Sequence, residues 1–190
     1  MLRHFSSATI DAAAALLHDG GVLAYPTEAV FGLGCHPHDQ VAFERLFALK
    51  QRPSDQGVLL IAADFSQVER YIDFNAVPAD VLRQVRASWP GPSTWIFPRS
   101  SQVPDWVVGA HAGIALRVTA HAPAAALCRA FGGALVSTSA NPHGEPSARS
   151  VQAVEAFFGN RLEGVLDAPL GDLAGPTVIR DALSGTVVRR

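Results

Sequence analysis

The chain contains one lysine, Lys50, beside fourteen arginines, and this lysine stands in the segment Lys50-Gln51-Arg52-Pro53. Lysine offers a compact, rotatable ammonium, whereas arginine offers a planar fork, so the two are not interchangeable at a shaped anion site. Lys50 and Arg52 together therefore predict a pocket for a phosphate or another anion. The alternative is that a composition favouring arginine left one surface lysine here by chance.

A group of small polar residues, Ser137-Thr138-Ser139-Ala140-Asn141, follows an apolar, strand-like run. Its three hydroxyls and one amide are neutral groups that bond phosphate oxygens or metal-bound water. Serine and threonine are also common where a strand ends in a turn, which is the structural alternative. The chain has no Gly-x-x-x-x-Gly-Lys-Ser/Thr sequence, so it would bind a nucleotide without a P-loop.

Arg117 lies inside an otherwise apolar run, residues 114–118. A charge in such a run must reach a polar face or pair with an anion. We expect its guanidinium to bind a substrate carboxylate. A structural ion pair with one of the seventeen acidic residues is the alternative.

The segment 25–35, Tyr-Pro-Thr-Glu-Ala-Val-Phe-Gly-Leu-Gly-Cys, directly follows a predicted strand. Open α/β sheets place ligand-binding loops at such positions, so this loop is a candidate site. Its glycines do not form a dinucleotide fingerprint, because the third glycine is absent. Thr27 and Glu28 are also ordinary turn and cap residues.

The elements that must position these residues alternate along the chain. Apolar periodicity, capping residues and glycine or proline stops predict five helices and seven strands. The expected helices cover residues 9–18, 39–50 (with Asp39 as N-cap), 78–88, 123–131 and 150–158, with a short helical pattern at 66–72; the expected strands cover 22–25, 58–62, 94–97, 114–118, 134–138, 177–180 and 186–189. This alternation predicts a single α/β domain spanning residues 1–190.

Composition limits the function classes. With 48% hydrophobic and 17% charged residues, 190 residues suffice for one soluble, well-packed domain. The apolar runs are too short to span a membrane and the N-terminus lacks the apolar core of a signal peptide, so we expect a cytoplasmic protein without membrane contact. The net charge of −2 argues against a broad nucleic-acid-binding surface, so any RNA contact should be local.

The residue types that commonly bind metals show no metal-site spacing. Cys35 and Cys128 are too far apart for a zinc knuckle and too few for a disulfide framework, so we expect two buried thiols. Five histidines lie in predicted loops without the spacing of a zinc enzyme, and we expect surface or cap roles for them. They are histidines 36, 38, 111, 121 and 143.

Four motifs occur in order along the chain: Tyr25-Pro26-Thr27-Glu28, Lys50-Gln51-Arg52-Pro53, Trp89-Pro90-Gly91-Pro92 and Ser139-Ala140-Asn141. In this combination the chain resembles the threonylcarbamoyl-AMP synthases of the YrdC/TsaC type, in their short bacterial single-domain form. The resemblance implies a twisted, open mixed sheet flanked by helices. It also implies a nucleotidyltransferase that joins L-threonine, bicarbonate or CO2, and ATP into threonylcarbamoyl-adenylate and pyrophosphate, with Mg2+ accompanying ATP. The product would serve N6-threonylcarbamoylation of adenosine 37 in tRNA, through other proteins that transfer the group.

The resemblance also implies site residues by position. Lys50, Arg52, Ser139 and Asn141 would form the catalytic set. The ATP-binding residues would be Lys50, Arg52, Ser54, Ser139, Asn141, Ser147 and Arg189; the threonine-binding residues would be Thr27, Arg117, Ser137 and Thr177, and no residue would be a metal ligand. Two positions depart from the family pattern: Leu59-Leu60-Ile61 stands where longer relatives often have a histidine, and Pro176 stands where a serine often precedes the threonine.

The implied chemistry needs positioning and cations more than a protein nucleophile, because a threonine carbamate is already an anion and a nucleophile. Two alternatives stay open. One is a paralogue with the same fold that acts on another substrate. The other is a non-catalytic RNA-binding module, which tight, steeply salt-dependent RNA binding without ATP turnover would reveal.

Overall fold

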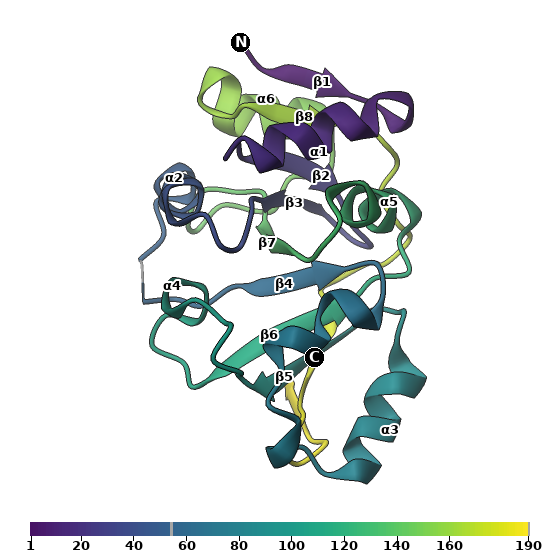
Figure 1. The fold of residues 1–190 in the computed structure, drawn as a ribbon. Helices are drawn as coiled ribbons and strands as arrows, with labels where there is room; N and C mark the ends of the chain where they lie inside the picture. Colours follow the sequence, from purple (N-terminus) through teal and green to yellow (C-terminus); the bar gives the residue numbers. More distant parts are fainter. Residues whose placement is uncertain (54, 190) are drawn as a thin grey trace.

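The computed structural model describes residues 1–53 and 55–189 (Figure 1). Within them, one mixed sheet has the strand order β1-β8-β2-β3-β7-β4-β6-β5-β9-β10. The strands are β1 (Arg3–Phe5), β2 (Leu23–Pro26), β3 (Phe31–Gly34), β4 (Leu59–Ala62), β5 (Ser93–Pro98), β6 (Gly113–Val118), β7 (Leu135–Ser139), β8 (Gly164–Leu166), β9 (Val178–Asp181) and β10 (Val187–Arg189). The helices are α1 (Ile10–His18), α2 (Gln40–Lys50), α3 (Ala79–Ser88), α4 (Asp105–Val108), α5 (Ala122–Phe131) and α6 (Val151–Phe158). The α/β class and the open mixed sheet flanked by helices are as expected.

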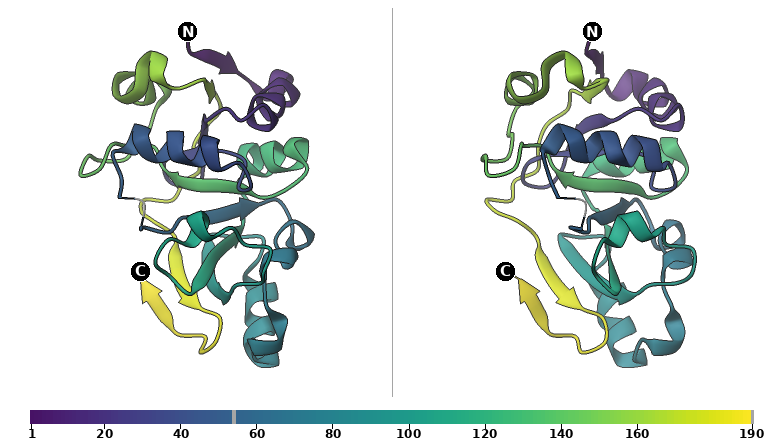
Figure 2. Two further views of the ribbon diagram at one scale, coloured as in Figure 1. Left: turned by 60° about the vertical axis from the view of Figure 1, so that its left-hand side comes forward. Right: turned by 90° about the vertical axis from the view of Figure 1, so that its left-hand side faces the viewer.

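The sheet separates two apolar cores. Neighbouring residues of one strand point to opposite faces, and in β2 Leu23 packs with α1 and α5 while Ala24 packs into the other core. The same alternation holds for Ile61 and Leu60 in β4. Figure 2 shows α1 and α5 on one side of the sheet and α2 and α6 on the other. These helices cover both faces of the part of the sheet that carries β2 and β7.

Helix α2 begins and ends where its sequence predicts. The Asp39 side chain accepts a hydrogen bond from the Ala42 amide at 3.0 Å, as expected of the N-cap. After Lys50 the chain leaves the helix through Gln51, which has a left-handed φ of 51°. The amides of Gln51 and Arg52 then bond back to helix carbonyls at 3.2 and 3.1 Å. This turn brings Lys50 and Arg52 to the region where β7 ends.

The segment 25–35 is a strand, a short turn and a second strand, not only a loop. Strands β2 and β3 pair antiparallel over four positions, from Leu23 with Gly34 to Pro26 with Phe31. A Cβ at Gly34 would lie 2.6 Å from the Val136 carbonyl oxygen and 2.7 Å from the Tyr25 ring, so this strand requires glycine. The glycines that make this segment look like a loop in sequence allow the strand to pack closely against its neighbours.

Other differences involve short elements. The expected strands and the five longer helices are present with ends shifted by about one residue, whereas β1, β8 and α4 were not predicted. The pattern at 66–72 forms two 3-10 turns, Phe65–Gln67 and Glu69–Tyr71, instead of a helix. Both cysteines are buried and free, as expected, and burial raises the pKa of the Cys128 thiol to about 12. Within residues 1–53 and 55–189, no helix has the length and apolar character needed to cross a membrane.

Candidate active site

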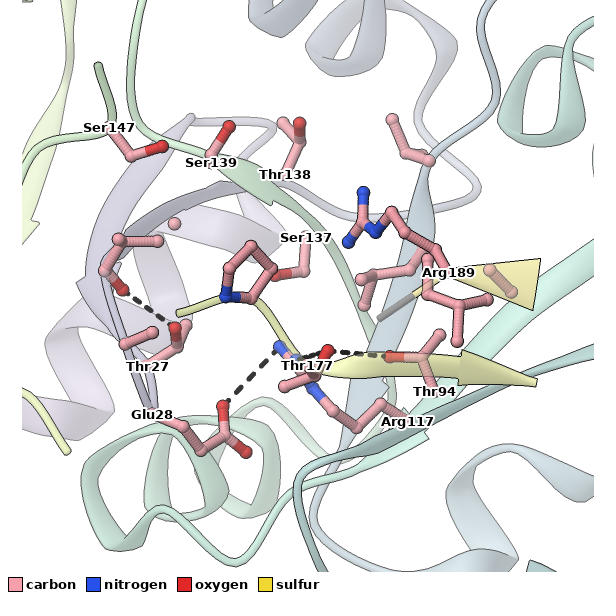
Figure 3. A pocket seen from close by; sticks show the side chains of 18 of the residues that line it. Thr27, Glu28, Thr94, Arg117, Ser137, Thr138, Ser139, Ser147, Thr177 and Arg189 are labelled. Atoms are coloured by element: carbon pink, nitrogen blue, oxygen red, sulfur yellow. Dashed lines mark hydrogen bonds and ion pairs between the residues drawn. The ribbon is translucent and has the colours of Figure 1, made fainter. Parts of the chain in front are cut away.

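A cavity of about 840 Å³ opens between the β2–β3 turn, the end of β7 and one face of strands β6, β5 and β9 (Figure 3). This volume suits a ligand of the size of a nucleotide with a second small molecule. Four arginines line it, Arg52, Arg117, Arg149 and Arg189, whereas Glu28 is the one carboxylate among its described lining residues. The excess of positive charge favours an anionic ligand.

One side of the cavity, which we call the polar floor, consists of Thr94, Thr177, Arg117 and Glu28. The Arg117 Nη1 donates to the Thr177 hydroxyl at 2.9 Å, and the hydroxyls of Thr177 and Thr94 are 3.2 Å apart. Arg117 Nη2 faces a Glu28 carboxylate oxygen at 3.6 Å (Figure 3). All four side chains are buried, so the floor is a pre-formed polar surface that water hardly reaches.

The opposite side, which we call the hydroxyl wall, presents the hydroxyls of Thr138, Ser139 and Ser147 (Figure 3). The guanidinium of Arg52 belongs to this wall through its contact with Thr138. Arg52 donates to the Thr138 hydroxyl at 3.0 Å and to the Gly57 carbonyl at 2.8 Å. Its Nε is buried without a partner in the described part of the chain. Burial also lowers the pKa of Arg52. An incoming anion would supply the missing partner for this guanidinium.

Lys50 lies behind the hydroxyl wall and does not line the cavity. Its ammonium donates to the backbone carbonyls of Ser139 and, at 2.9 Å, Asn141, while its own carbonyl accepts from the His143 amide at 2.7 Å. Its side chain is buried, and burial, together with the nearby charge of Arg52, lowers its pKa to about 8. Lys50 therefore fastens the end of α2 to the turn that follows β7.

Asn141 also holds this turn and does not line the cavity. Its amide group donates to the carbonyls of Pro142 and Glu145 at 2.9 and 2.8 Å, and its oxygen accepts from the Ser147 hydroxyl at 3.3 Å. The side chain thus shapes residues 141–147 and presents Ser147 to the cavity. Direct contact of Lys50 and Asn141 with phosphates stays a prediction, and their observed contacts give them a positioning role.

The family model Sua5_yciO_yrdC, described as telomere recombination, matches residues 15–190. This chain belongs to the Sua5/YciO/YrdC family. A Stenotrophomonas maltophilia protein named threonylcarbamoyl-AMP synthase is 51% identical over 95% of this chain and 97% of its own length. A Halorhodospira halophila protein of the same name is 54% identical over 94% of this chain and 92% of its own length.

Solved structures of the family have the same fold. Pyrococcus abyssi Sua5, named "P. abyssi Sua5 complexed with L-threonine", superimposes with a TM-score of 0.87 at 29% identity, covering 95% of this chain and 54% of that longer chain. Escherichia coli YciO superimposes with a TM-score of 0.85 at 25% identity, covering 100% of this chain and 96% of its own.

This member of the Sua5/YciO/YrdC family brings together most of the residues predicted for the site. The predicted residues that line the cavity are Thr27, Arg52, Arg117, Ser137, Ser139, Ser147, Thr177 and Arg189. Ser54 lies outside the described residues. Leu59 and Pro176, the two departures from the family pattern, also line the cavity, whereas Ile61 packs into the core formed with α1 and α5.

The sequence did not indicate four polar residues that line the cavity, Glu28, Thr94, His111 and Arg149, nor Thr119, whose hydroxyl donates to Glu28. Glu28 belongs to the Tyr25-Pro26-Thr27-Glu28 motif, where its type also suits a turn or cap, although an acidic residue beside a ligand loop is the natural partner for a buried arginine. Thr94 and Thr119 gave no signal beyond strand propensity. His121 stands at the N-cap of α5, as expected of a cap residue, and it is half-buried with its Nε2 3.1 Å from the Pro169 carbonyl oxygen.

Proposed function

We propose that this protein is a threonylcarbamoyl-AMP synthase that converts L-threonine, bicarbonate and ATP into threonylcarbamoyl-adenylate, pyrophosphate and water. The observation that carries the proposal is one cavity in which a buried polar floor lies opposite a hydroxyl wall. About half of the residues are identical in the curated synthases over nearly the whole chain. The structure named as a threonine complex has the same fold.

The polar floor suits threonine. Arg117 donates to Thr177 with Nη1 and faces Glu28 with Nη2 across an open gap of 3.6 Å, so its guanidinium keeps donor capacity for the carboxylate of the substrate. The hydroxyls of Thr27 and Ser137 lie between floor and wall, where the methyl and hydroxyl of threonine would pack (Figure 3). Anchoring the carboxylate fixes the substrate so that the carbamate formed on its amine comes within reach of a phosphate held at the hydroxyl wall.

The hydroxyl wall suits the triphosphate of ATP. Arg52 and the hydroxyls of Ser139 and Ser147 would bond its oxygens, and Arg189 at the cavity rim would contact the nucleotide. The carbamate oxygen attacks the α-phosphorus while the bond to the pyrophosphate oxygen breaks. Arg52 stabilises negative charge on the phosphoryl oxygens, so the step needs no protein nucleophile.

Mg2+ would arrive with ATP as part of the substrate. The described lining offers one carboxylate, Glu28, and it faces Arg117, while no group of three potential metal ligands occurs among residues 1–53 and 55–189. Neutral hydroxyls such as Ser139 and Ser147 fit a metal held mainly by phosphates and waters. The product would then pass to tRNA-modifying transfer proteins, and its use on tRNA supports a cytoplasmic location.

Pyrophosphate release tests the proposal. The protein is incubated with ATP and Mg2+, L-threonine and bicarbonate are omitted in turn, and L-serine replaces threonine as the control. Release that requires both co-substrates and favours threonine is the expected result. Release with another amino acid would indicate a paralogous function, whereas no release together with salt-sensitive RNA binding would indicate the binding module.

A further inference from the structure

Glu28 is rigidly held at the edge of the polar floor. Its Oε1 accepts a hydrogen bond from the Thr119 hydroxyl at 2.6 Å. Its backbone carbonyl accepts from the Leu173 amide at 3.0 Å, and a Cβ at Gly171 would lie 2.8 Å from its Cα, so segment 171–173 packs directly on its backbone. The side chain is buried, and its Oε2 has no hydrogen-bond partner among the described residues. The charge of Glu28 is therefore fixed in place and only partly satisfied.

The ion pair between Glu28 and Arg117 is open. The separation of 3.6 Å balances the two charges but is too long for a good hydrogen bond. Two exposed pairs of the same chain close fully: Arg45 reaches Glu163 at 2.8 Å and Arg99 reaches Asp105 at 2.6 Å. A buried pair gains more from close contact than an exposed one. The open geometry leaves the guanidinium of Arg117 available to a ligand while Glu28 neutralises its charge.

Charge balance then restricts which ligands the floor accepts. Glu28 and Arg117 together carry no net charge in a buried site, where an unbalanced charge is costly. A simple carboxylate bound to Arg117 would leave one negative charge in excess beside Glu28. A zwitterionic amino acid brings a carboxylate for Arg117 and an ammonium attracted by Glu28, so the floor stays neutral.

We propose that Glu28, through its open pair with Arg117, makes this subsite selective for a zwitterionic amino acid over a carboxylate without an amine. The inference rests on the proposed function, since it assumes that threonine binds at the polar floor. Glu28 is a selectivity and positioning residue: it acts on the charge of Arg117 and on the ammonium group of the substrate.

Glu28→Gln separates this role from a structural one. The amide has the same shape and still accepts the Thr119 hydrogen bond, but it lacks the negative charge. L-threonine should bind at least tenfold more weakly, because its ammonium loses its counter-charge. 3-Hydroxybutyrate, which is threonine without the amine, should bind at least threefold more tightly, because the charge of Arg117 is no longer balanced. A merely structural role would weaken both ligands.

The experiment measures binding of both ligands by titration calorimetry to the wild type, Glu28→Gln, Glu28→Asp and the exposed control Glu69→Gln. Opposite shifts for the two ligands in Glu28→Gln, with threonine preference kept in Glu28→Asp and Glu69→Gln, support the proposal. Equal weakening of both ligands, or no change in either, overturns it.

The wild type alone also tests the proposal, should Glu28→Gln fail to fold. It must prefer L-threonine to 3-hydroxybutyrate by at least tenfold, and equal affinities overturn the selectivity of the floor. If the wild type binds no threonine at all, the proposed function fails, which is distinct from threonine binding without amine selectivity.

Discussion

Replacing Lys50 by methionine removes the ammonium behind the hydroxyl wall while keeping an unbranched side chain of similar length. The ammonium donates to the carbonyls of Ser139 and Asn141, so its loss should loosen the turn that presents the Ser139 and Ser147 hydroxyls to the cavity. We expect pyrophosphate release to fall at least tenfold, which corresponds to about 1.4 kcal/mol of transition-state stabilisation.

The same variant should change how stability depends on pH. Burial, with a smaller contribution from Arg52, lowers the pKa of Lys50 from 10.5 to about 8. The unfolded chain therefore binds more protons at this lysine than the folded protein between these pH values, and the free energy of unfolding rises with pH. The full difference corresponds to about 3 kcal/mol, of which about 2 kcal/mol falls between pH 8 and pH 10.

Urea unfolding of both proteins at several pH values from 8 to 10 measures this effect. The wild type should gain about 2 kcal/mol relative to Lys50→Met over this range, and the comparison cancels the titration of all other groups. Parallel pH profiles would show that the ammonium is solvated and would refute the burial argument. Near-normal pyrophosphate release by the variant would show that the Lys50 ammonium does not contribute to the reaction.

Three further outcomes follow from the structure. Arg117→Ala should raise the KM for threonine at least tenfold and change the KM for ATP little; an unchanged threonine KM in steady-state kinetics would exclude Arg117 from the subsite. Gly34→Ala should destabilise the protein by about 1–3 kcal/mol in urea unfolding, because its Cβ meets a fixed carbonyl, whereas Gly175→Ala, with no atom within 4 Å of the added Cβ, should not. Burial lowers the pKa of His36 and His38 below 6.5. The unfolded state therefore binds protons first, and the free energy of unfolding should fall as pH drops from 7 to 5. The double variant with glutamine at both positions should lose less stability over this pH range, and an equal loss would show that these two histidines do not cause the pH dependence.

Local signals predicted the elements that local interactions stabilise. Helix α2 carries its N-cap, Asp39, and its stop, Pro53, in its own sequence, so its limits were predicted correctly. Strands β1 and β8 are three residues long and pair with each other across about 160 positions, from Arg3 with Gly164. Such strands exist because distant segments meet, and no short window of sequence contains that information.

Residue type predicted the ligand chemistry better than the position of each side chain. The lone lysine beside Arg52 indicated an anion site. Its position behind the cavity wall, however, results from its hydrogen bond to the turn that follows β7, which only the fold brings close. Glu28 looked like a turn residue because its partner, Arg117, comes 89 positions later in the chain. The site could be predicted as a set of residues, whereas the contacts among them required the fold.

The double attachment between Lys50 and the turn after β7 has an evolutionary consequence. Segments 50–52 and 139–147 share both side-chain and main-chain bonds, so substitutions in one change the environment of the other. Stability and activity effects in the two segments should therefore be non-additive. Chimaeras that take one segment from a distant relative should be less stable and less active than chimaeras that take both. The two segments are therefore expected to change together during evolution.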